Sequence, residues 1–471
     1  MVNDSINLNE ISLNKVLSIH FVGIGGIGMS GLASVLHQLG HQISGSDLND
    51  SQITHRLAKK GMRIVRGHCQ SHIHDVTDLV VITSALSPDN PEITKAKQLH
   101  IPVITRGEML ALLMNRRYGI AVSGTHGKTT TTAMLTSIFK HAKLKPSFVV
   151  GGVIQSLDKT ADVGESSFFI AEADESDQSF LALQPQNAII TNIDYDHMCQ
   201  YDHDITKVNQ SFIDFAQNVP QSGLLAINID CPKIQLLQRK FTQAKLISFG
   251  LSSDANIQAV NCTYHALTSQ FEVIDKINQQ SFEVILNMPG EHNVLNALGA
   301  IVISLFHGVK ATAIQTALAQ FQGVARRFEV SEIVNQSTSF TLINDYGHHP
   351  AEIKATLRTI RSAFPGRRIV HLFQPHRYSR TSEHFKAFIN ALADADQSVV
   401  LKTYAASEQP IEGIDAETLA NALSNKGSTC YYAGDHNKAE QILKSFVNHK
   451  DVVLIQGAGD INQIVPRLKC W

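Results

Sequence analysis

The chain has 471 residues, enough for about three domains at the usual domain size. Hydrophobic residues make up 43% of it, which excludes a disordered chain, and the net charge of −2 excludes a global field that would attract nucleic acid. Six cysteines are scattered without a CxxC pair, which indicates reduced thiols rather than a disulfide or zinc framework. Because the N-terminus lacks a secretory hydrophobic region and no apolar run could span a bilayer, we expect a cytoplasmic protein without membrane insertion.

Strand patterns and helix patterns alternate along three successive stretches. In residues 1–116, KVLSIHFVGIGG predicts a strand entering a glycine turn, and MSGLASVLHQLG predicts a helix that ends at Gly40. Residues 117–324 repeat this order, and NCTYHALTSQFEVIDKINQQSFEVILNMPG has the pattern of antiparallel strands. In residues 325–471, the runs TLIND, RIVHLF, SVVLKTYAA and DVVLIQ predict further strands with helices between them. We therefore predict an α/β protein of three consecutive domains, with a mixed sheet in the central one.

The central stretch contains a glycine loop, SGTHGKTTTT, between a predicted strand and a predicted helix. Backbone N–H groups of such a loop bind phosphate oxygens, Lys128 would reach the terminal phosphates, and the Thr129 hydroxyl would bind Mg²⁺. The loop departs from the usual pattern, because Val122 stands where a first glycine is expected, five residues before Gly127. The alternative is a helix start that contains Gly-Lys-Thr by chance, which the strand before it and the helix after it argue against.

An acidic segment follows the next predicted strand. FFIAEADESD places Glu172, Asp174 and Glu175 at its end. Such a cluster alone is usually a solvated loop, but in the same unit as a phosphate loop its oxygens suit Mg²⁺.

The first stretch contains a second glycine loop. Gly23, Gly25 and Gly28 lie between strand and helix, and Asp47 follows about twenty residues later, the arrangement expected for a nucleotide diphosphate and ribose. A nicotinamide dehydrogenase is one interpretation, but an ATP loop in the next domain is not the catalytic segment that it would need.

Two polar runs occur in the last stretch. NDYGHHPAEI and HLFQPHRYSRT contribute Asp345, His348, His349, His376, Arg377 and Arg380. Histidines and arginines on loops suit carboxylate or phosphate binding. A zinc site is less favoured, since ligand spacing and a cysteine partner are missing, and surface loops without a role remain the plain alternative.

Together these motifs resemble those of the ATP-dependent Mur ligases over nearly the whole chain. The segments that carry the resemblance are GIGGIGMSGLA, GTHGKTTT, AEADESD, TNIDYDHM, GEHNVLNALGA, ARRFE, NDYGHHP, FQPHRYSRT and QGAGDI. The resemblance implies a Rossmann-like domain for the UDP-sugar at 1–116, a P-loop ATP domain at 117–324, and a Rossmann-like domain at 325–471 that completes the ATP and amino-acid site.

The resemblance also implies roles for individual residues. The UDP-sugar would contact Gly23, Gly25, Gly26, Gly28, Asp47, His68, Ser84 and Arg106. ATP would contact Gly124, Thr125, His126, Gly127, Lys128, Thr129, Thr130, His292, Asn293, Asn296, Arg327 and Asp345. Metal ligands would be Thr129, Glu172 and His197, and the catalytic set would be Lys128, His348, Arg377 and Arg380.

Within this family, Gly347 in YGHHP favours the branch that joins L-alanine to UDP-N-acetylmuramate over the recycling branch that attaches a whole tripeptide. Ser211 and Phe212 stand where ligases acting later in the pathway carry a modified lysine, in agreement with that branch. Two Mg²⁺ ions, which Mn²⁺ could replace, and a monomer or weak homodimer are expected. Folylpolyglutamate synthases share the ATP domain but lack the first glycine-loop domain, and a non-catalytic nucleotide binder would not need Lys128, Thr129 and Glu172.

The reaction that this resemblance implies passes through an acyl phosphate. The lactyl carboxylate would attack the γ-phosphate of ATP, and the amine of L-alanine would then displace phosphate. His348 is our candidate for the general base, because histidine titrates in the useful range.

Overall fold

The computed structural model describes residues 8, 11–83, 86–196, 198–334, 339–406 and 408–471. The chain divides into two compact units. The first holds the chain up to Asn261 with Phe271–Val284 and Val294–Phe321, and the second holds Cys262–Gln270, Ile285–Asn293 and Gln322–Trp471. None of the helices formed by the described residues is long and apolar enough to cross a membrane.

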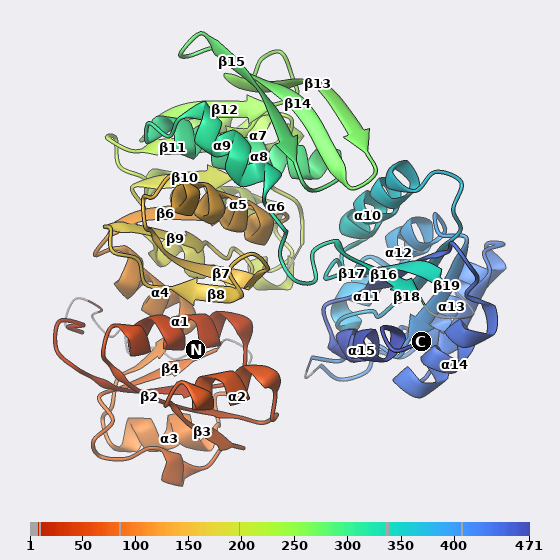
Figure 1. The fold of residues 1–471 in the computed structure, drawn as a ribbon. Coiled ribbons are helices and arrows are strands. Elements are labelled where there is room, and N and C mark those ends of the chain that lie inside the picture. The colour runs from red at the N-terminus through yellow and green to blue at the C-terminus, as the bar shows by residue number, and fades with distance from the viewer. Residues whose placement is uncertain (1–7, 9–10, 84–85, 197, 335–338, 407) are drawn as a thin grey trace. The chain divides into compact units, whose positions relative to one another are not determined.

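The chain begins with a parallel sheet of order β3-β2-β1-β4-β5. Its strands are β1 (Ser18–Val22), β2 (Gln42–Asp47), β3 (Arg63–Arg66), β4 (Leu79–Ile82) and β5 (Val103–Thr105). Its helices are α1 (Ile27–Gln38), α2 (Gln52–Lys59), α3 (Pro91–Gln98) and α4 (Arg106–Met114). Helix α1 packs on one face, against Phe21, and α3 packs on the other, where Ile93 joins Val22 and Val80 (Figure 1). Strand β1 lies between β2 and β4, and the strand order reverses between β1 and β4. The first glycine loop follows β1 at this point, which is where ligands bind in such sheets.

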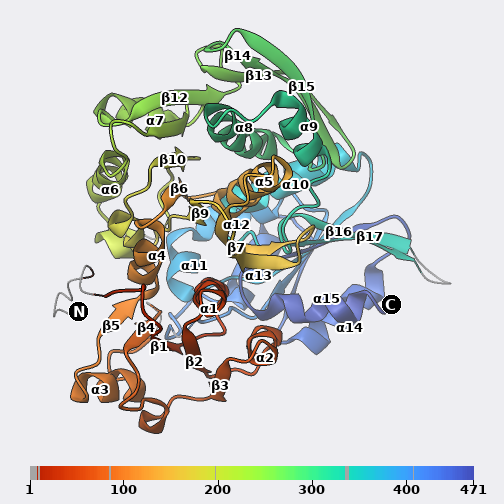
Figure 2. The ribbon, with the colours of Figure 1, turned by 60° about the vertical axis from the view of Figure 1, so that its left-hand side comes forward.

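The central sheet has ten strands in the order β15-β14-β13-β12-β11-β10-β6-β9-β7-β8. They are β6 (Tyr118–Ser123), β7 (Ser147–Ile154), β8 (Lys159–Asp162), β9 (Phe168–Glu172), β10 (Asn187–Ile190), β11 (Leu224–Asn228), β12 (Lys245–Gly250), β13 (Ile257–His265), β14 (Thr268–Asp275) and β15 (Gln280–Leu286). The helices are α5 (Lys128–His141), α6 (Ile205–Gln217), α7 (Pro232–Leu237), α8 (Glu291–Phe306) and α9 (Ala311–Ala319). Helices α5 and α9 lie side by side, as Figure 2 shows. Strand β8 pairs antiparallel with β7 while β6 and its neighbours are parallel, so the predicted mixed sheet is confirmed.

The last sheet has the order β16-β17-β21-β18-β19-β20 and is parallel except for the antiparallel pair β16–β17. Its strands are β16 (Glu329–Val334), β17 (Ser339–Asp345), β18 (Ile369–Phe373), β19 (Gln397–Leu401), β20 (Cys430–Ala433) and β21 (Val452–Gln456). Its helices are α10 (Pro350–Ala363), α11 (Tyr378–Glu383), α12 (Phe385–Leu392), α13 (Ala416–Asn425), α14 (His436–Phe446) and α15 (Val465–Leu468). Strands β18, β19 and β21 are buried along their whole length, as expected for parallel strands covered on both faces. The polar runs NDYGHHP and FQPHRYSR therefore begin at the carboxyl edge of this sheet.

Candidate active site

Residues 124–130 form the turn after β6 and the first turn of α5, as the sequence predicts. Gly124 and Gly127 have φ angles of +127° and +84°, which other residues rarely adopt. A Cβ atom at Gly124 would lie 2.2 Å from Thr191 Oγ1, and one at Gly127 would lie 2.3 Å from Asn296 Oδ1. The structure thus places Asn296, from α8, beside the loop. A side chain at either position would therefore be strained and would collide with these neighbours, so the loop requires glycine at both.

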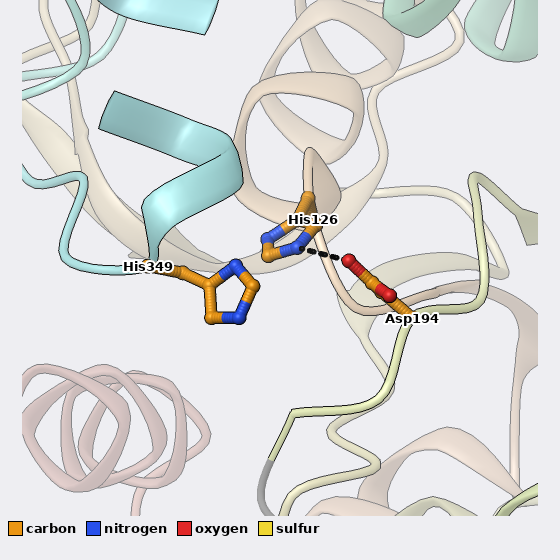
Figure 3. A group of neighbouring side chains, drawn as sticks. All are labelled: His126, Asp194 and His349. Carbon is orange, nitrogen blue, oxygen red and sulfur yellow. Dashed lines mark ion pairs between the residues drawn. The ribbon is translucent and has the colours of Figure 1, made fainter. Parts of the chain in front are cut away.

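The rest of the loop is anchored to the segment after β10. Asn192 receives hydrogen bonds from the backbone N–H groups of Thr125, at 3.2 Å, and His126, at 2.9 Å. The His126 ring faces Asp194 (Figure 3), with Nε2 3.7 Å from the carboxylate, and Lys233 lies 2.8 Å from the other oxygen of that carboxylate. These partners, His126 foremost, hold the pKa of Asp194 well below its usual range. The loop therefore keeps its shape through contacts formed before any ligand arrives.

The Lys128 ammonium is bound to protein oxygens. Its Nζ lies 2.7 Å from Glu175 Oε2 and donates to the carbonyl oxygens of Gly124, at 2.7 Å, and Thr125, at 3.3 Å. Burial opposes the charged form, but Glu175 and Asp174 outweigh it and raise the pKa of Lys128. Burial also raises the pKa of Glu175, to about 7, although Lys128 acts in the opposite direction. Lys128 is thus a fixed cation. Its counter-ion, Glu175, has a pKa close to neutral pH.

The predicted metal ligands meet at the ends of β9 and the glycine loop. Thr129 Oγ1 donates to Glu172 Oε2 at 3.1 Å, and the backbone N–H of Gly151 donates to the other oxygen of Glu172. Adjacent ligands of an octahedral Mg²⁺ with bonds of about 2.1 Å lie roughly 3 Å apart, so this hydroxyl and carboxylate fit one ion. The third predicted ligand, His197, lies outside the described residues.

Arg106 joins the first glycine loop to the acidic segment. It is the first residue of α4, and its Nη2 lies 3.1 Å from Asp174 and 3.6 Å from Asp177. A Cβ atom at Gly28 would lie 3.1 Å from Arg106 Cδ, so this glycine gives the arginine room. Burial alone would raise the pKa of Asp174, but Lys128 and Arg106 lower it to about 2. Arg106, a predicted UDP-sugar contact, and Lys128, a predicted ATP contact, therefore both act on the carboxylate of Asp174.

The first glycine loop is held by the end of β2. The N–H of Gly23 donates to Ser46 O at 2.8 Å, and the N–H of Gly25 donates to Asp47 Oδ2 at 2.9 Å. The other oxygen of Asp47 accepts from Asn49 N at 2.9 Å. The carboxylate predicted to bind ribose thus already supports the loop. Gly26 is the N-cap of α1, and Ser84 lies outside the described residues.

The start of α8 carries two further predicted ATP contacts. His292 lines a cavity of about 320 Å³ with Gly290 and the α10 residues Arg358 and Thr359. Burial lowers the pKa of His292, so its ring is neutral at pH 7. Asn293 is buried and donates through Nδ2 to Pro289 O at 2.7 Å.

Asp345 is the centre of a hydrogen-bond network in the last sheet. Its carboxylate accepts from Phe328 N at 3.0 Å, Gly347 N at 2.9 Å, Thr356 Oγ1 at 3.3 Å and Gln456 Nε2 at 2.7 Å. It is 8% exposed. These partners belong to four different segments, so Asp345 joins the start of β16, the GHHP loop (residues 347–350), helix α10 and the end of β21.

The GHHP loop is positioned by Glu352, the third residue of α10. Glu352 accepts from the N–H groups of His348, at 2.9 Å, and His349, at 3.1 Å, and completes a capping box with His349. Arg327 lies 4.0 Å from the same carboxylate and places its guanidinium over the Tyr346 ring.

The second polar run comes close to the first. The rings of His348 and His376 lie 5.7 Å apart, and Arg380 Nη1 lies 3.4 Å from His376 Nδ1. Tyr404 stacks on His376 with ring centroids 5.5 Å apart. Arg377 has φ +71°, uncommon for a residue with a side chain and found more often at functional sites. Of the predicted catalytic residues of the last domain, His348 and Arg380 therefore both lie beside the His376 ring, and Arg377 follows His376 in the chain.

Sequence reasoning missed two of these positioning carboxylates. It considered Glu175 only as a metal ligand, not as the partner of Lys128, because the 47-residue separation leaves no local signal. It also missed Glu352, although the spacing His349-x-x-Glu352 has the pattern of a capping box.

Three family models cover most of the chain. Residues 18–118 match the Mur ligase family catalytic domain, 122–304 the Mur ligase middle domain, and 326–459 the Mur ligase glutamate ligase domain. The chain therefore belongs to the Mur ligase family, and the predicted fold class is confirmed.

Individual relatives are similar over nearly their full length. The chain is 45% identical over 450 residues to a UDP-N-acetylmuramate–L-alanine ligase of Pelobacter propionicus, covering 95% of this chain and 96% of that one. The crystal structure of a UDP-N-acetylmuramate–alanine ligase, MurC, from Thermotoga maritima superposes with a TM-score of 0.83 at 30% identity, over 96% of this chain and 99% of the other. A murein peptide ligase from Psychrobacter arcticus shares the fold, with a TM-score of 0.75 at 24% identity over 96% and 98% of the two chains.

Proposed function

We infer that this protein joins L-alanine to the lactyl carboxylate of UDP-N-acetylmuramate at the expense of ATP, with ADP and phosphate as the other products. The observation that carries the inference is one glycine loop at which Lys128 pairs with Glu175 and Thr129 pairs with Glu172, in a chain 45% identical over 95% of its length to a ligase of that name. A nicotinamide dehydrogenase would not need the glycine loop at residues 124–130 in addition to the one at residues 23–28.

The residues suggest how the chain would perform the two steps. Backbone N–H groups at the N-terminus of α5 would bind the phosphates, and Lys128 would neutralise charge as the γ-phosphoryl group moves to the lactyl oxygen. The resulting acyl phosphate is an activated carbonyl that an amine can attack. Thr129 and Glu172 would hold Mg²⁺, which supplies charge neutralisation when bound.

The last domain would receive the amino acid. Arg377 and Arg380 provide guanidinium donors that suit the alanine carboxylate and the acyl phosphate. His348 would take the proton from the alanine ammonium group, as its ring lies 5.7 Å from that of His376, which contacts Arg380. The remaining assignments made from the family resemblance are part of this proposal. They include a second Mg²⁺ at His197, domain limits of 116 and 324, a cytoplasmic location, and a monomer or weak homodimer.

Phosphate release from ATP tests the proposal, with UDP-N-acetylmuramate and L-alanine each omitted in turn. We expect release only when all three substrates are present. Lys128→Ala should reduce kcat by at least about 100-fold, the usual effect of removing a transition-state donor. Lys140→Ala, in the last turn of the same helix, is the matched control and should retain activity.

Two results would change the assignment. Turnover with L-Ala-γ-D-Glu-diaminopimelate but not with L-alanine would move the protein to the recycling branch. No turnover with either acceptor, from folded protein that binds ATP, would refute the proposed acceptor site.

A further inference from the structure

The two predicted catalytic arginines of the last domain stand at the start of a short helix, α11. Arg377 directly precedes the helix, and Arg380 is its third residue. Arg377 has φ +71° and ψ 138°, and its side chain does not cap the helix. This backbone conformation is unfavourable for a residue with a side chain and persists only where the surrounding structure holds it. The contacts that hold this turn therefore determine where both guanidinium groups can reach.

Glu408 supplies the cap of α11 from a distant part of the chain. Its Oε2 accepts from Ser379 N at 3.0 Å, and its Oε1 accepts from Ser379 Oγ at 2.6 Å. Ser379 is the second residue of α11, so its N–H is one of those that a helix leaves without an internal partner. A negative charge at a helix N-terminus is also favourable. Both oxygens of Glu408 thus fix the backbone between Arg377 and Arg380.

Tyr404, which also follows β19, completes the attachment. Its carbonyl oxygen accepts from Arg377 N at 2.8 Å, and its own N–H donates to Pro375 O at 2.9 Å. Its ring stacks on His376, whose Nδ1 lies 3.4 Å from Arg380 Nη1. The backbone of Tyr404 therefore holds the turn before α11, and its ring reaches Arg380 through His376.

Side-chain packing leaves the start of α11 only partly enclosed. Tyr378, the first residue of the helix, lines a cavity of about 500 Å³ together with Thr403 and Tyr432. A side chain that faces open space loses the dispersion contacts that a packed neighbour would provide. The hydrogen bonds of Glu408 therefore contribute more to the position of α11 than they would against a closely packed core.

We propose that Glu408 is a positioning residue for the acceptor amino acid. Through Ser379 it holds Arg377 and Arg380 where they bind the carboxylate of L-alanine, and it does not itself touch a substrate. The inference rests on the proposed function, which assigns that carboxylate to the two arginines. Without Glu408 the strained turn at Arg377 relaxes and both guanidinium groups are misplaced, and a misplacement of about 1 Å can cost about 100-fold in rate.

The effect should fall on L-alanine and not on ATP. The glycine loop at residues 124–130, to which we assign the phosphates, belongs to the other compact unit of the chain. A defect confined to the amino acid would therefore distinguish positioning of the arginines from a general loss of structure.

Steady-state kinetics and calorimetry with the full-length protein test the proposal. In Glu408→Ala the KM for L-alanine should rise at least about 10-fold, while the KM for UDP-N-acetylmuramate and the Kd for ATP stay within about twofold of wild type. Glu408→Gln should raise the KM for L-alanine only about threefold, since its amide oxygen still accepts a hydrogen bond but without the charge. Glu412→Gln removes an exposed carboxylate four residues further along the chain. This matched control should change none of the three constants.

A double-mutant cycle shows whether Glu408 acts through Ser379. Ser379→Ala removes the hydroxyl bond but keeps the backbone N–H, so it should raise the KM for L-alanine about threefold. In the Glu408→Ala background the same substitution should have no further effect. Should Glu408→Ala fail to fold, the cycle with Glu408→Gln gives the same test.

Three results would overturn the inference. They are an unchanged KM for L-alanine in the Glu408 variants, a rise in this KM matched by an equal loss of ATP binding, and additive effects of the Ser379 and Glu408 substitutions. All three leave the proposed function intact, because the wild type still turns over L-alanine. If the wild type itself does not use L-alanine, the proposed function fails and this inference fails with it.

Discussion

Replacing Glu175 with glutamine should strengthen ATP binding. The Lys128 ammonium lies 2.7 Å from this buried carboxylate, so a triphosphate must compete with Glu175 for the lysine and lies near its charge. Two unit charges about 5 Å apart repel by about 3 kcal/mol at an effective dielectric constant of about 20. Screening by Lys128 and by salt reduces this to about 1.4 kcal/mol, a tenfold decrease in Kd.

The pH dependence tests the cause of the change. Because the pKa of Glu175 is raised to about 7, the wild-type carboxylate is mostly ionised at pH 8 and mostly protonated at pH 6. The two proteins should therefore differ about tenfold in Kd at pH 8 and converge at pH 6. Calorimetry with Mg-ATP, without the other substrates, measures both values.

A matched carboxylate serves as control. Glu165→Gln removes an exposed charge paired with Lys145, and its Kd for ATP should stay within about twofold of wild type. Equal Kd values for Glu175→Gln and wild type at pH 8, or a tenfold difference that persists at pH 6, would refute the reasoning.

Two further predictions concern single positions. Gly127→Ala should abolish measurable ATP binding, because its Cβ would lie 2.3 Å from Asn296 Oδ1. The control is Gly308→Ala, at φ +71° in open space, which should cost about 1 kcal/mol of stability but retain ATP binding. His371 is fully buried, and burial lowers its pKa to about 3, below the unfolded value of 6.5, so stability is lost as the pH falls from 6.5 toward 3. His371→Phe should therefore reduce the loss of unfolding free energy between pH 7.5 and pH 5 by about 2 kcal/mol in urea titrations, whereas His55→Gln, at an exposed site, should not. Loss of ATP binding in Gly308→Ala, or equal acid sensitivity in His371→Phe and wild type, would contradict these two expectations.

The parts of the site that could be predicted are those encoded by consecutive residues. A glycine loop between a strand and a helix has a local pattern, so Gly124, Gly127 and Lys128 could be placed from the sequence alone. Strand ends could be placed as well, because uninterrupted apolar runs such as VVLIQ are typical of buried parallel strands.

Pairings between distant segments could not be predicted in this way. Arg106 meets Asp174 across 68 residues, and Asp345 meets Gln456 across 111 residues. The residues around each partner carry no local signal of the pairing, and only the packing of the sheets determines which donor reaches which carboxylate. Asp47 illustrates the limit, since its spacing predicted a ribose contact while the fold also uses it to support Gly25.

The network around Asp345 changes what Gly347 can tell about specificity. A Cβ atom at Gly347 would lie 2.6 Å from both Asp345 Oδ1 and Gln456 Nε2, so alanine could enter only if this network rearranged. Glycine at this position is therefore explained by the tight packing inside the last domain, and it need not reflect which amine substrate the protein accepts. Alanine at this position would require those hydrogen bonds to be redistributed, which is a packing cost inside the last domain.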